Sequence, residues 1–304
     1  MIKRTLYFGN PAYLNTHLEQ LEIKMLETGE TKSVPIEDIG VLILDNQQIT
    51  ITQAVMAKLL ANNTALISCD NTHHPVGMLL NLDGHTLQSR IFTAQIEASE
   101  PLKKQLWQQT IIAKIQNQAA VLGMQNQSGN LFNAPDKSLL NFSKDVKSGD
   151  SDNTEAAAAA YYWKRIFPSF LEFTRDREGD APNNLLNYGY AILRAIVARS
   201  LVGSGLLPTL GIHHRNQYNA YCLADDIMEP YRPYVDKVVC DIVDMNGQYL
   251  EMTPNMKKQL LTIPAMDVMI DEQRSPLMNA VQRTTSSLAK CYEGKIRKIL
   301  YPVL

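Results

Sequence analysis

The chain has 304 residues, of which 45% are hydrophobic and 20% charged, values typical of a soluble globular protein of roughly two domains. Its formal net charge of -2 provides no global attraction for nucleic acid, so DNA or RNA binding would depend on local basic patches. The longest apolar runs are too short to span a membrane, and the N-terminal segment MIKRTLYFGN lacks the apolar core of a signal peptide. The scattered cysteines form no CxxC pair, so we expect reduced, buried thiols in a cytoplasmic protein that does not bind a membrane.

The N-terminal part of the chain is predicted to be mainly β-strands. Apolar residues alternate with charged ones over 21–25, and turn-forming residues follow at 27–30, which together predict a β-hairpin. One helix is predicted over 52–62, where apolar residues follow helical spacing and Thr52 could serve as the cap. Short apolar runs bounded by Asp, Asn or Gly predict further strands at 39–44, 64–68 and 75–82.

The pattern changes after Gly84. Apolar residues recur every three or four positions and predict helices over 87–98 and 102–122. The polar stretch 123–136 contains Gly and Pro and is predicted to be a loop. Helical spacing resumes after this loop and is expected to continue to the C-terminus.

This change of period predicts an α+β fold with two domains. A β-rich N-terminal domain is expected at 1–85, and a larger all-α domain is expected at 86–304. Tyr7 and Phe8 are expected to be exposed near a strand edge of the first domain, where they would contribute to a dimer interface.

Glu155 begins a segment, EAAAAAYYW, with very high helix propensity. The preceding Asp, Asn and Thr residues offer caps, so Glu155 is predicted to fall in the first turn of a helix. The helix macrodipole alone explains a glutamate at this position. The small alanine side chains would also let a second backbone or a ligand approach the carboxylate, which makes Glu155 a candidate site residue.

The segment NNLLNYGYA, at 183–191, introduces a long apolar helix. Asn187, Tyr188 and Tyr190 carry polar groups that must find hydrogen-bond partners if they are buried. Two interpretations fit equally well: a core helix whose polar groups are satisfied, or one wall of a site for a polar ligand.

Acidic residues gather at Asp225, Asp226 and Glu229, which a helix would place within one turn of each other. Like charges so arranged repel, whereas a divalent cation held between them would turn the repulsion into coordination. His214 lies 15 residues before Glu229, far enough for a loop to fold back onto the helix. One imidazole among carboxylates suits Mn²⁺ or Mg²⁺ better than Zn²⁺. A His-His pair beside a solvated acidic face is the alternative interpretation.

Three motifs, with the upstream Glu155, strongly resemble a known family. They are NNLLNYGYA (183–191), LGIHH (210–214) and DIMEPYRP (226–233). In this order they resemble the CRISPR-associated endonucleases that act as spacer integrases, most of all the branch found beside type II effector nucleases. The resemblance covers essentially the whole chain, because that family also has an N-terminal β domain followed by a helical domain.

The resemblance implies a homodimeric, metal-dependent endonuclease and integrase. With a small CRISPR-associated partner protein, such an enzyme joins the 3′-hydroxyl ends of short foreign double-stranded DNA segments to a CRISPR repeat by transesterification. Other adaptation and effector proteins of type II systems are further implied partners. The implied function is spacer acquisition in antiviral defence.

The same resemblance implies that Glu155, His214 and Glu229 are the catalytic residues and the ligands of Mg²⁺ or Mn²⁺. Many family members have aspartate where this chain has Glu229, although the type II branch tends to carry glutamate there. Asp226 matches a family aspartate near the site, and His213 is expected to support the site from its loop without binding the metal.

Phosphate contacts require local positive charge. Arg215 adjoins His214 and Arg232 follows Glu229, so these two are the candidate DNA-binding residues. Other basic candidates lie at 175, 177, 290, 295, 297 and 298, and aromatic residues at 161–163 could stack on an unpaired base. Two alternatives remain at this stage: a metal-dependent phosphohydrolase of a small substrate, and a non-catalytic assembly module whose acidic cluster neutralises arginines.

Overall fold

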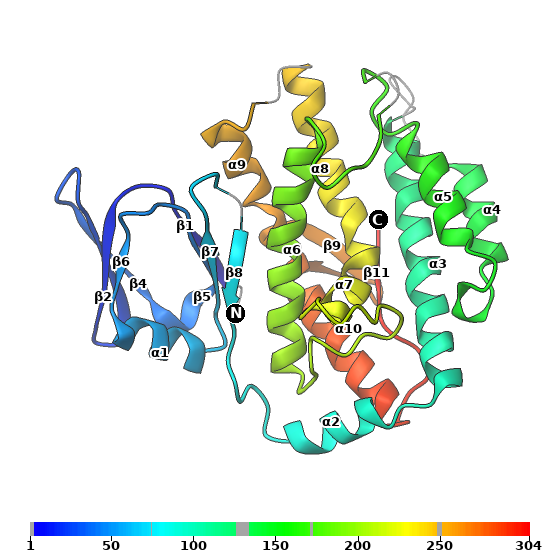
Figure 1. The fold of residues 1–304 in the computed structure, drawn as a ribbon, viewed down its shortest axis with the longest axis horizontal. Coiled ribbons are helices and arrows are strands. Elements are labelled where there is room, and N and C mark those ends of the chain that lie inside the picture. The colour runs from blue at the N-terminus through cyan, green and yellow to red at the C-terminus, as the bar shows by residue number, and fades with distance from the viewer. Residues whose placement is uncertain (1–2, 74, 126–133, 171–172, 248–250) are drawn as a thin grey trace.

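The computed structural model describes residues 3–73, 75–125, 134–170, 173–247 and 251–304. Strands gather in the N-terminal part of the chain, and helices make up most of the rest (Figure 1). The described strands are β1 (Arg4–Phe8), β2 (Ala12–His17), β3 (Gln20–Met25), β4 (Thr31–Pro35), β5 (Ile39–Leu44), β6 (Thr50–Ile51), β7 (Ala65–Cys69), β8 (Pro75–Leu79), β9 (Asp267–Ile270), β10 (Gln273–Pro276) and β11 (Pro302–Val303).

The described α-helices are α1 (Gln53–Ala61), α2 (Gln88–Ile96), α3 (Glu100–Gln125), α4 (Lys137–Asp145), α5 (Thr154–Trp163), α6 (Asn183–Gly203), α7 (Cys222–Met228), α8 (Arg232–Asn246), α9 (Pro254–Leu260) and α10 (Leu277–Tyr292). Short 3₁₀ helices are η1 (Ile36–Asp38), η2 (Ser148–Asp150), η3 (Glu229–Tyr231) and η4 (Ile263–Ala265). The predicted hairpin at 21–30 and the predicted helices at 52–62, 87–98 and 102–122 are confirmed within a few residues. Most of the loop predicted at 123–136 lies outside the described residues.

Two sheets form the N-terminal part. The first has the order β1-β5-β7-β8, in which β1, β5 and β7 run parallel and β8 is antiparallel to β7. The second has the order β4-β3-β2-β6. Strand β5 is buried on both faces: Leu42 faces the small core between these sheets and α1, whereas Val41 and Ile43 belong to the large core of the helices. This double burial explains the continuous apolar run of β5.

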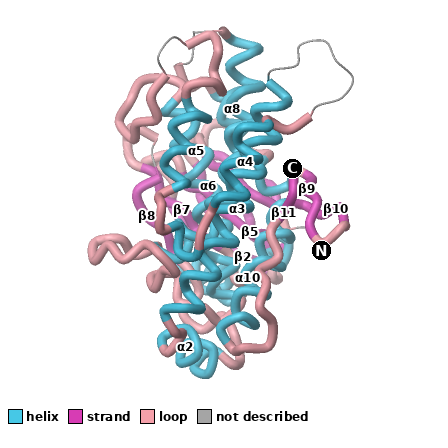
Figure 2. The backbone as a smooth tube through the Cα atoms, turned by 90° about the vertical axis from the view of Figure 1, so that its right-hand side faces the viewer, coloured by secondary structure: helices cyan, strands magenta, loops and turns pink. Residues whose placement is uncertain are grey.

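Helices α3, α4 and α5 form the side of the molecule opposite the N-terminal strands (Figure 1), which faces the viewer in Figure 2. Helix α6 packs against α7, α8 and α10 in the centre of the helical region. By length and composition α6 could span a membrane, but 83% of its most apolar stretch is buried inside the protein. It is therefore the kind of helix that forms the core of a globular domain.

The expectation of an all-α C-terminal region is wrong in one respect. A small antiparallel sheet of order β10-β9-β11 lies among its helices. Val268 and Ile270 of β9 are buried and alternate with exposed residues, so the strand pattern is present but only four residues long. Asp271 and Glu272 form the hairpin turn with positive φ of 51° and 60°. This turn normally favours Asn or Gly, so its sequence lacks the usual hairpin signal.

The expectation of an exposed Phe8 is also wrong. Phe8 is 7% exposed and belongs to the small core. The Tyr7 hydroxyl donates a hydrogen bond to Asp45 Oδ2 at 2.5 Å. The expected strand edge is present, because β1 is an edge strand of its sheet. All four cysteines are free and buried, as expected.

A buried ion pair connects the strands to the helices. Asp45, at the end of β5, is 1% exposed and accepts a hydrogen bond from Lys257 of α9 at 2.9 Å. Tyr7 and His73 also contact this carboxylate. Removing one partner of such a pair leaves an uncompensated buried charge, so Asp45 and Lys257 fix the position of the first sheet against α9.

Asp236 of α8 connects three helices of the core. Its carboxylate is 1% exposed and accepts hydrogen bonds from the Tyr162 hydroxyl of α5, at 2.9 Å, and from the Tyr190 hydroxyl of α6. Burial raises the pKa of Asp236 to about 6, against the lowering effect of these two hydroxyls and of nearby arginines. The tyrosine hydroxyls supply the hydrogen bonds that a buried carboxyl group requires.

The raised pKa of Asp236 predicts a pH-dependent contribution to stability. Between pH 4 and 6 the native carboxyl holds a proton that the unfolded chain has released, so this group destabilises the native state as the pH rises. Asp236→Asn removes this titrating group. Its free energy of unfolding should therefore lack the fall of about 3 kcal/mol that Asp236 contributes as the pH rises from 4 to 6, at 1.36 kcal/mol per pKa unit. Urea unfolding of both proteins from pH 4 to 7 measures it. A constant difference between the two free energies of unfolding would contradict the prediction.

Candidate active site

Lys114 of α3 brings together two carboxylates from distant parts of the chain. Its Nζ lies 2.5 Å from Glu155 Oε1 and 2.7 Å from Glu229 Oε2. Lys114 and Glu229 are buried, at 9% and 5% exposure, whereas the Glu155 side chain is 24% exposed. We call Glu155, Lys114 and Glu229 the carboxylate-lysine cluster.

Local hydrogen bonds position both carboxylates. Glu155 lies in the first turn of α5, as predicted, and Asp150, one of the preceding acidic residues expected to offer a cap, supplies the capping carboxylate. It accepts the backbone N–H of Thr154 at 2.9 Å and that of Glu155 at 3.1 Å. On the other side, Asn117 donates to the carbonyl oxygen of Pro230 at 2.8 Å, directly after Glu229. Because Asn117 is one turn beyond Lys114, the same face of α3 supplies the ammonium group and holds the turn that carries Glu229.

Arg232 contacts the other oxygen of Glu229, with Nε 3.0 Å from Oε1. Burial alone would raise the pKa of the Glu229 carboxyl, but the charges of Arg232 and Lys114 outweigh it and hold the pKa below its ordinary value. Burial alone would likewise lower the pKa of Lys114, and the charges of Glu229 and Glu155 reverse this. Together with Arg232, the cluster therefore places two carboxylates in contact with two cationic side chains.

His214 lies beside this cluster on a loop that folds back, as expected. Its Nδ1 is 2.5 Å from Asp226 Oδ1, and this hydrogen bond raises the pKa of His214 above its ordinary value. The negative charges of Glu229 and Glu155 act in the same direction, which shows that the imidazole is within their electrostatic reach. With Nδ1 bonded to Asp226, Nε2 is the nitrogen left for a ligand.

Asp226 is fully buried and organises the His214 loop. Besides the imidazole, its carboxylate accepts the backbone N–H groups of Ile212 at 2.6 Å and His213 at 2.9 Å. The His213 ring stacks on Trp107 of α3 with centroids 4.3 Å apart. Asp226 and His213, which the sequence places near the site without a direct role in metal binding, thus both hold the His214 loop in place.

The structure does not place the acidic residues around one shared cation. Asp225 forms a two-point ion pair with Arg194, at 2.7 and 2.9 Å, so each carboxylate of 225–229 has its own partner. Arg215 is exposed and pairs with Glu100 at 2.8 Å, outside the carboxylate-lysine cluster. Tyr162 is fully buried, so it cannot stack on a base.

Sequence reasoning missed Lys114, Asn117 and Trp107. All three lie on the buried face of α3, a helix that its periodicity correctly predicted. The available signal was a lysine and an asparagine three residues apart among buried apolar positions such as Ile111 and Ile115. A buried lysine requires an acidic partner, but the sequence does not say which one.

Comparison with known proteins gives a consistent result. Residues 6–267 match the family model described as "CRISPR associated protein Cas1". The chain is 38% identical to the CRISPR-associated endonuclease Cas1 of Neisseria meningitidis serogroup C (strain 8013), covering 94% of this chain and 91% of that protein.

Two solved structures share the fold. A casposase bound to its integration product has a TM-score of 0.79 at 20% identity and covers 98% of this chain and 92% of its own. A Cas6-RT-Cas1–Cas2 complex has a TM-score of 0.73 at 19% identity and covers 98% of this chain and 36% of its own. At these identities the likeness concerns the fold.

Lys114→Met should destabilise the metal-free protein. The substitution keeps the length of the side chain but leaves Glu155 facing the buried Glu229 without the ammonium between them. We expect the free energy of unfolding in EDTA to fall by about 3 kcal/mol. Urea unfolding measures this, and Glu155→Gln in the same background should restore part of the loss. A variant as stable as the native protein would show that the ion pairs contribute nothing to folding.

Proposed function

Because the chain belongs to the Cas1 family of CRISPR-associated endonucleases, we propose that it joins the 3′-hydroxyl ends of short foreign DNA segments to a CRISPR repeat. The reaction is a phosphodiester transesterification, the step by which new spacers are acquired in antiviral defence. The observation that supports it best is the carboxylate-lysine cluster, because it joins two carboxylates from distant segments of the chain whose charges act on the His214 imidazole. Membership of this family favours the integrase over the two alternative functions, a phosphohydrolase of a small substrate and a non-catalytic assembly module.

The donor set of this site fits a hard divalent cation. Among the described residues no three His, Cys, Asp or Glu side chains form a ready-made cage, because Lys114 lies between the carboxylates. Glu229 Oε2, however, is buried and receives no well-directed hydrogen bond, although Lys114 Nζ is 2.7 Å away. Glu155, Glu229 and His214 would hold Mg²⁺ or Mn²⁺, which would neutralise charge on the reacting phosphate.

Each of the other side chains at the site has a separate proposed role. Asp226 keeps His214 in one orientation with Nε2 directed away from the Nδ1 hydrogen bond, so the imidazole is ready to bind a ligand. Arg232 keeps Glu229 ionised at neutral pH. The attacking group is the 3′-hydroxyl of the DNA segment itself, so no protein nucleophile is needed. Lys114 offers a compact positive charge where negative charge develops on the phosphate.

Double-stranded DNA, a small Cas2 protein and a second copy of this chain are the proposed partners. The Cas1–Cas2 complex among the structural neighbours supports the Cas2 partner. We further propose that the enzyme acts in the cytoplasm within a type II system, and that its parts are a strand-rich domain at 1–85 and a helical domain at 86–304.

The proposed dimer uses the strand-rich domain. Because Phe8 is buried, the contact surface is assigned to the edge strand β8 instead. Val76 and Leu79 of β8 are 65% and 42% exposed, and Leu82 just beyond it is 92% exposed. An exposed apolar edge strand is a ready surface for pairing with another chain.

Strand joining tests the proposed function. The full chain, its Cas2 partner, a short duplex with 3′-hydroxyl ends and a supercoiled plasmid carrying a repeat are combined with Mn²⁺, Mg²⁺ or EDTA. We expect metal-dependent joining that falls about a hundredfold or more in Glu229→Gln and His214→Ala. Glu97→Gln, at an exposed position on the end of α2, serves as the matched control. Joining that persists in both site variants would contradict the assignment of the site.

The dimer assignment makes a separate prediction. Val76→Lys would place a charge from each copy in the interface, so the dissociation constant of the dimer should rise at least about tenfold. Met245→Lys, at a residue of α8 that is 72% exposed, should leave it unchanged. Sedimentation equilibrium of the full-length proteins measures both constants. Equal constants for the two variants would exclude β8 from the interface.

A further inference from the structure

The Lys114 ammonium group occupies the space between the two carboxylates that the proposed metal ion would also contact. Its Nζ lies 2.5 Å from Glu155 Oε1 and 2.7 Å from Glu229 Oε2. A divalent cation within about 2.1 Å of the same two oxygens would lie less than about 5 Å from Nζ. Two cations this close repel each other, most of all where the surroundings are as buried as Glu229. The ammonium group and the metal ion are therefore alternative partners of these carboxylates.

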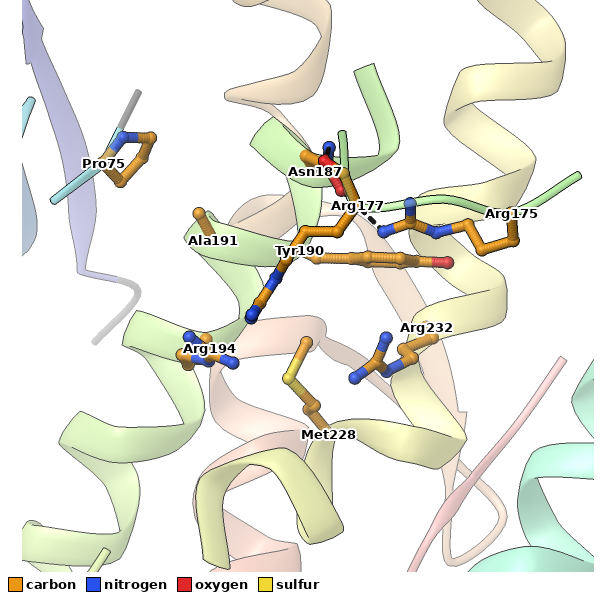
Figure 3. Close-up of a pocket in the computed structure, with 9 residues that line it drawn as sticks. All are labelled: Pro75, Arg175, Arg177, Asn187, Tyr190, Ala191, Arg194, Met228 and Arg232. Carbon is orange, nitrogen blue, oxygen red and sulfur yellow. Dashed lines mark hydrogen bonds between the residues drawn. The ribbon is translucent and has the colours of Figure 1, made fainter. Parts of the chain in front are cut away.

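Arg232, the other cation at Glu229, does not lie between the two carboxylates. Of the two it contacts only Glu229, with Nε 3.0 Å from Oε1. Its guanidinium carbon is also 4.8 Å from the centre of the Tyr190 ring. Figure 3 shows Arg232 and Tyr190 together in the lining of a neighbouring pocket. Lys114 is thus the cation whose place a metal ion shared by both carboxylates would take.

The contact between Lys114 and Glu229 is an ion pair without a well-directed hydrogen bond. Glu229 Oε2 is buried and has no hydrogen-bond partner among the described residues, although Nζ is 2.7 Å away. The ammonium group donates instead to Glu155 Oε1. A metal ion has no N–H bond that must point at its acceptor, so it would satisfy Oε2 where the ammonium group does not.

A second buried lysine shows how a structural ion pair differs from this one. Lys257 Nζ is 2.9 Å from Asp45 Oδ2, and the Asp45 carboxylate also accepts a hydrogen bond from the Tyr7 hydroxyl. Asp45 would therefore keep a partner without its lysine. The Glu155 side chain, in contrast, forms a hydrogen bond or ion pair with Lys114 alone among the described residues. Another cation is the natural replacement for Lys114 at this position.

We propose that Lys114 is an internal counter-ion, which a divalent metal ion displaces when it binds to Glu155 and Glu229. In the metal-free protein the ammonium group neutralises the two carboxylates. On metal binding, its flexible four-carbon side chain turns out of the space between them. Metal affinity is then determined by competition with a charge that the protein itself carries. The assignment of the two carboxylates as metal ligands rests on the proposed function, whereas the competition rests on the contacts of Lys114.

Metal binding in the absence of DNA tests the displacement. The full-length native protein, Lys114→Met and Lys114→Arg are freed of metal and titrated with Mn²⁺ in a calorimeter. Lys114→Met removes the competing charge, so its dissociation constant for Mn²⁺ should be at least about tenfold lower than that of the native protein. Lys114→Arg retains the charge and should bind no more tightly than the native protein. Lys295→Met, at an exposed lysine paired with Glu293, is the matched control and should leave the constant unchanged.

Two results of this titration would overturn the proposal. If Lys114→Met bound Mn²⁺ only as tightly as the native protein, or more weakly, Lys114 would merely hold the carboxylates in position for the metal. If Lys114→Arg gained as much affinity as Lys114→Met, the effect would not depend on the charge of the side chain.

A second measurement uses the native protein, so it does not depend on the stability of Lys114→Met. The chain is labelled with ¹⁵N at the lysine Nζ atoms, and proton exchange of the ammonium groups with water is followed by NMR in EDTA and at saturating Mg²⁺. Lys114 and Lys257 are assigned by the signals missing from Lys114→Arg and Lys257→Arg. We expect Mg²⁺ to accelerate exchange at Lys114 at least about tenfold, because the ammonium group leaves its carboxylates, and to leave Lys257 unchanged. Equal exchange at Lys114 in both conditions would contradict the displacement.

Strand joining distinguishes a failure of this proposal from a failure of the proposed function. If the native protein joined DNA with metal but Lys114→Met bound Mn²⁺ no more tightly, the displacement would fail while the proposed function stood. If Lys114→Met bound Mn²⁺ more tightly but the native protein joined no DNA, only the proposed function would fail. If neither protein bound Mn²⁺, the assignment of the metal ligands would be wrong, and the displacement with it.

Discussion

The contact of one buried and one partly exposed carboxylate with a single buried ammonium group is the constraint on which the active-site architecture depends. A carboxylate as buried as that of Glu229 is costly unless cations neutralise it, and Arg232 and Lys114 are those cations. Meeting this requirement forces α3, the start of α5 and the turn after α7 to converge on one point. Asn117 then fixes the turn through the Pro230 carbonyl, so that a single helix face determines both the charge and the geometry of the site.

The same requirement is met differently elsewhere in the core. Asp45 forms an ion pair with Lys257, and the Asp226 carboxylate accepts hydrogen bonds from backbone N–H groups and contacts the His214 imidazole. Asp236 receives two tyrosine hydroxyls and no ion pair, and burial then raises its pKa to about 6. Burial therefore outweighs the two hydrogen bonds at Asp236 and raises its pKa, whereas the two cations that contact Glu229 outweigh burial and lower the pKa of that carboxyl. The second arrangement suits the proposed role of Glu229 as a ligand of a divalent cation.

Local structure was largely predictable from sequence, because periodicity and turn residues determine it locally. The hairpin at 21–30 and the long helix α3 followed from these patterns. The sheet of β9, β10 and β11 did not, because its strands are short and β11 pairs with β9 across the whole of α10. The motifs also named Glu155 and Glu229, and both carboxylates contact Lys114 in the structure. Tertiary packing brings Lys114 to these two carboxylates, so residue spacing along the chain cannot predict the contact.

Arg232 connects the two halves of the site. It lies three residues after Glu229, so one helical turn directs its guanidinium both to that carboxylate and into a neighbouring pocket, which is also lined by Arg175, Arg177 and Arg194. A cation bound to Glu229 would compete with Arg232 for the carboxylate, and an anion in the pocket would attract the guanidinium away from it. Because both effects would move the same side chain in the same direction, a cation at the carboxylate-lysine cluster and an anion in the pocket would be thermodynamically linked. The short sequence EPYR (229–232) thereby connects the charge of the carboxylate-lysine cluster to the charge of the neighbouring pocket.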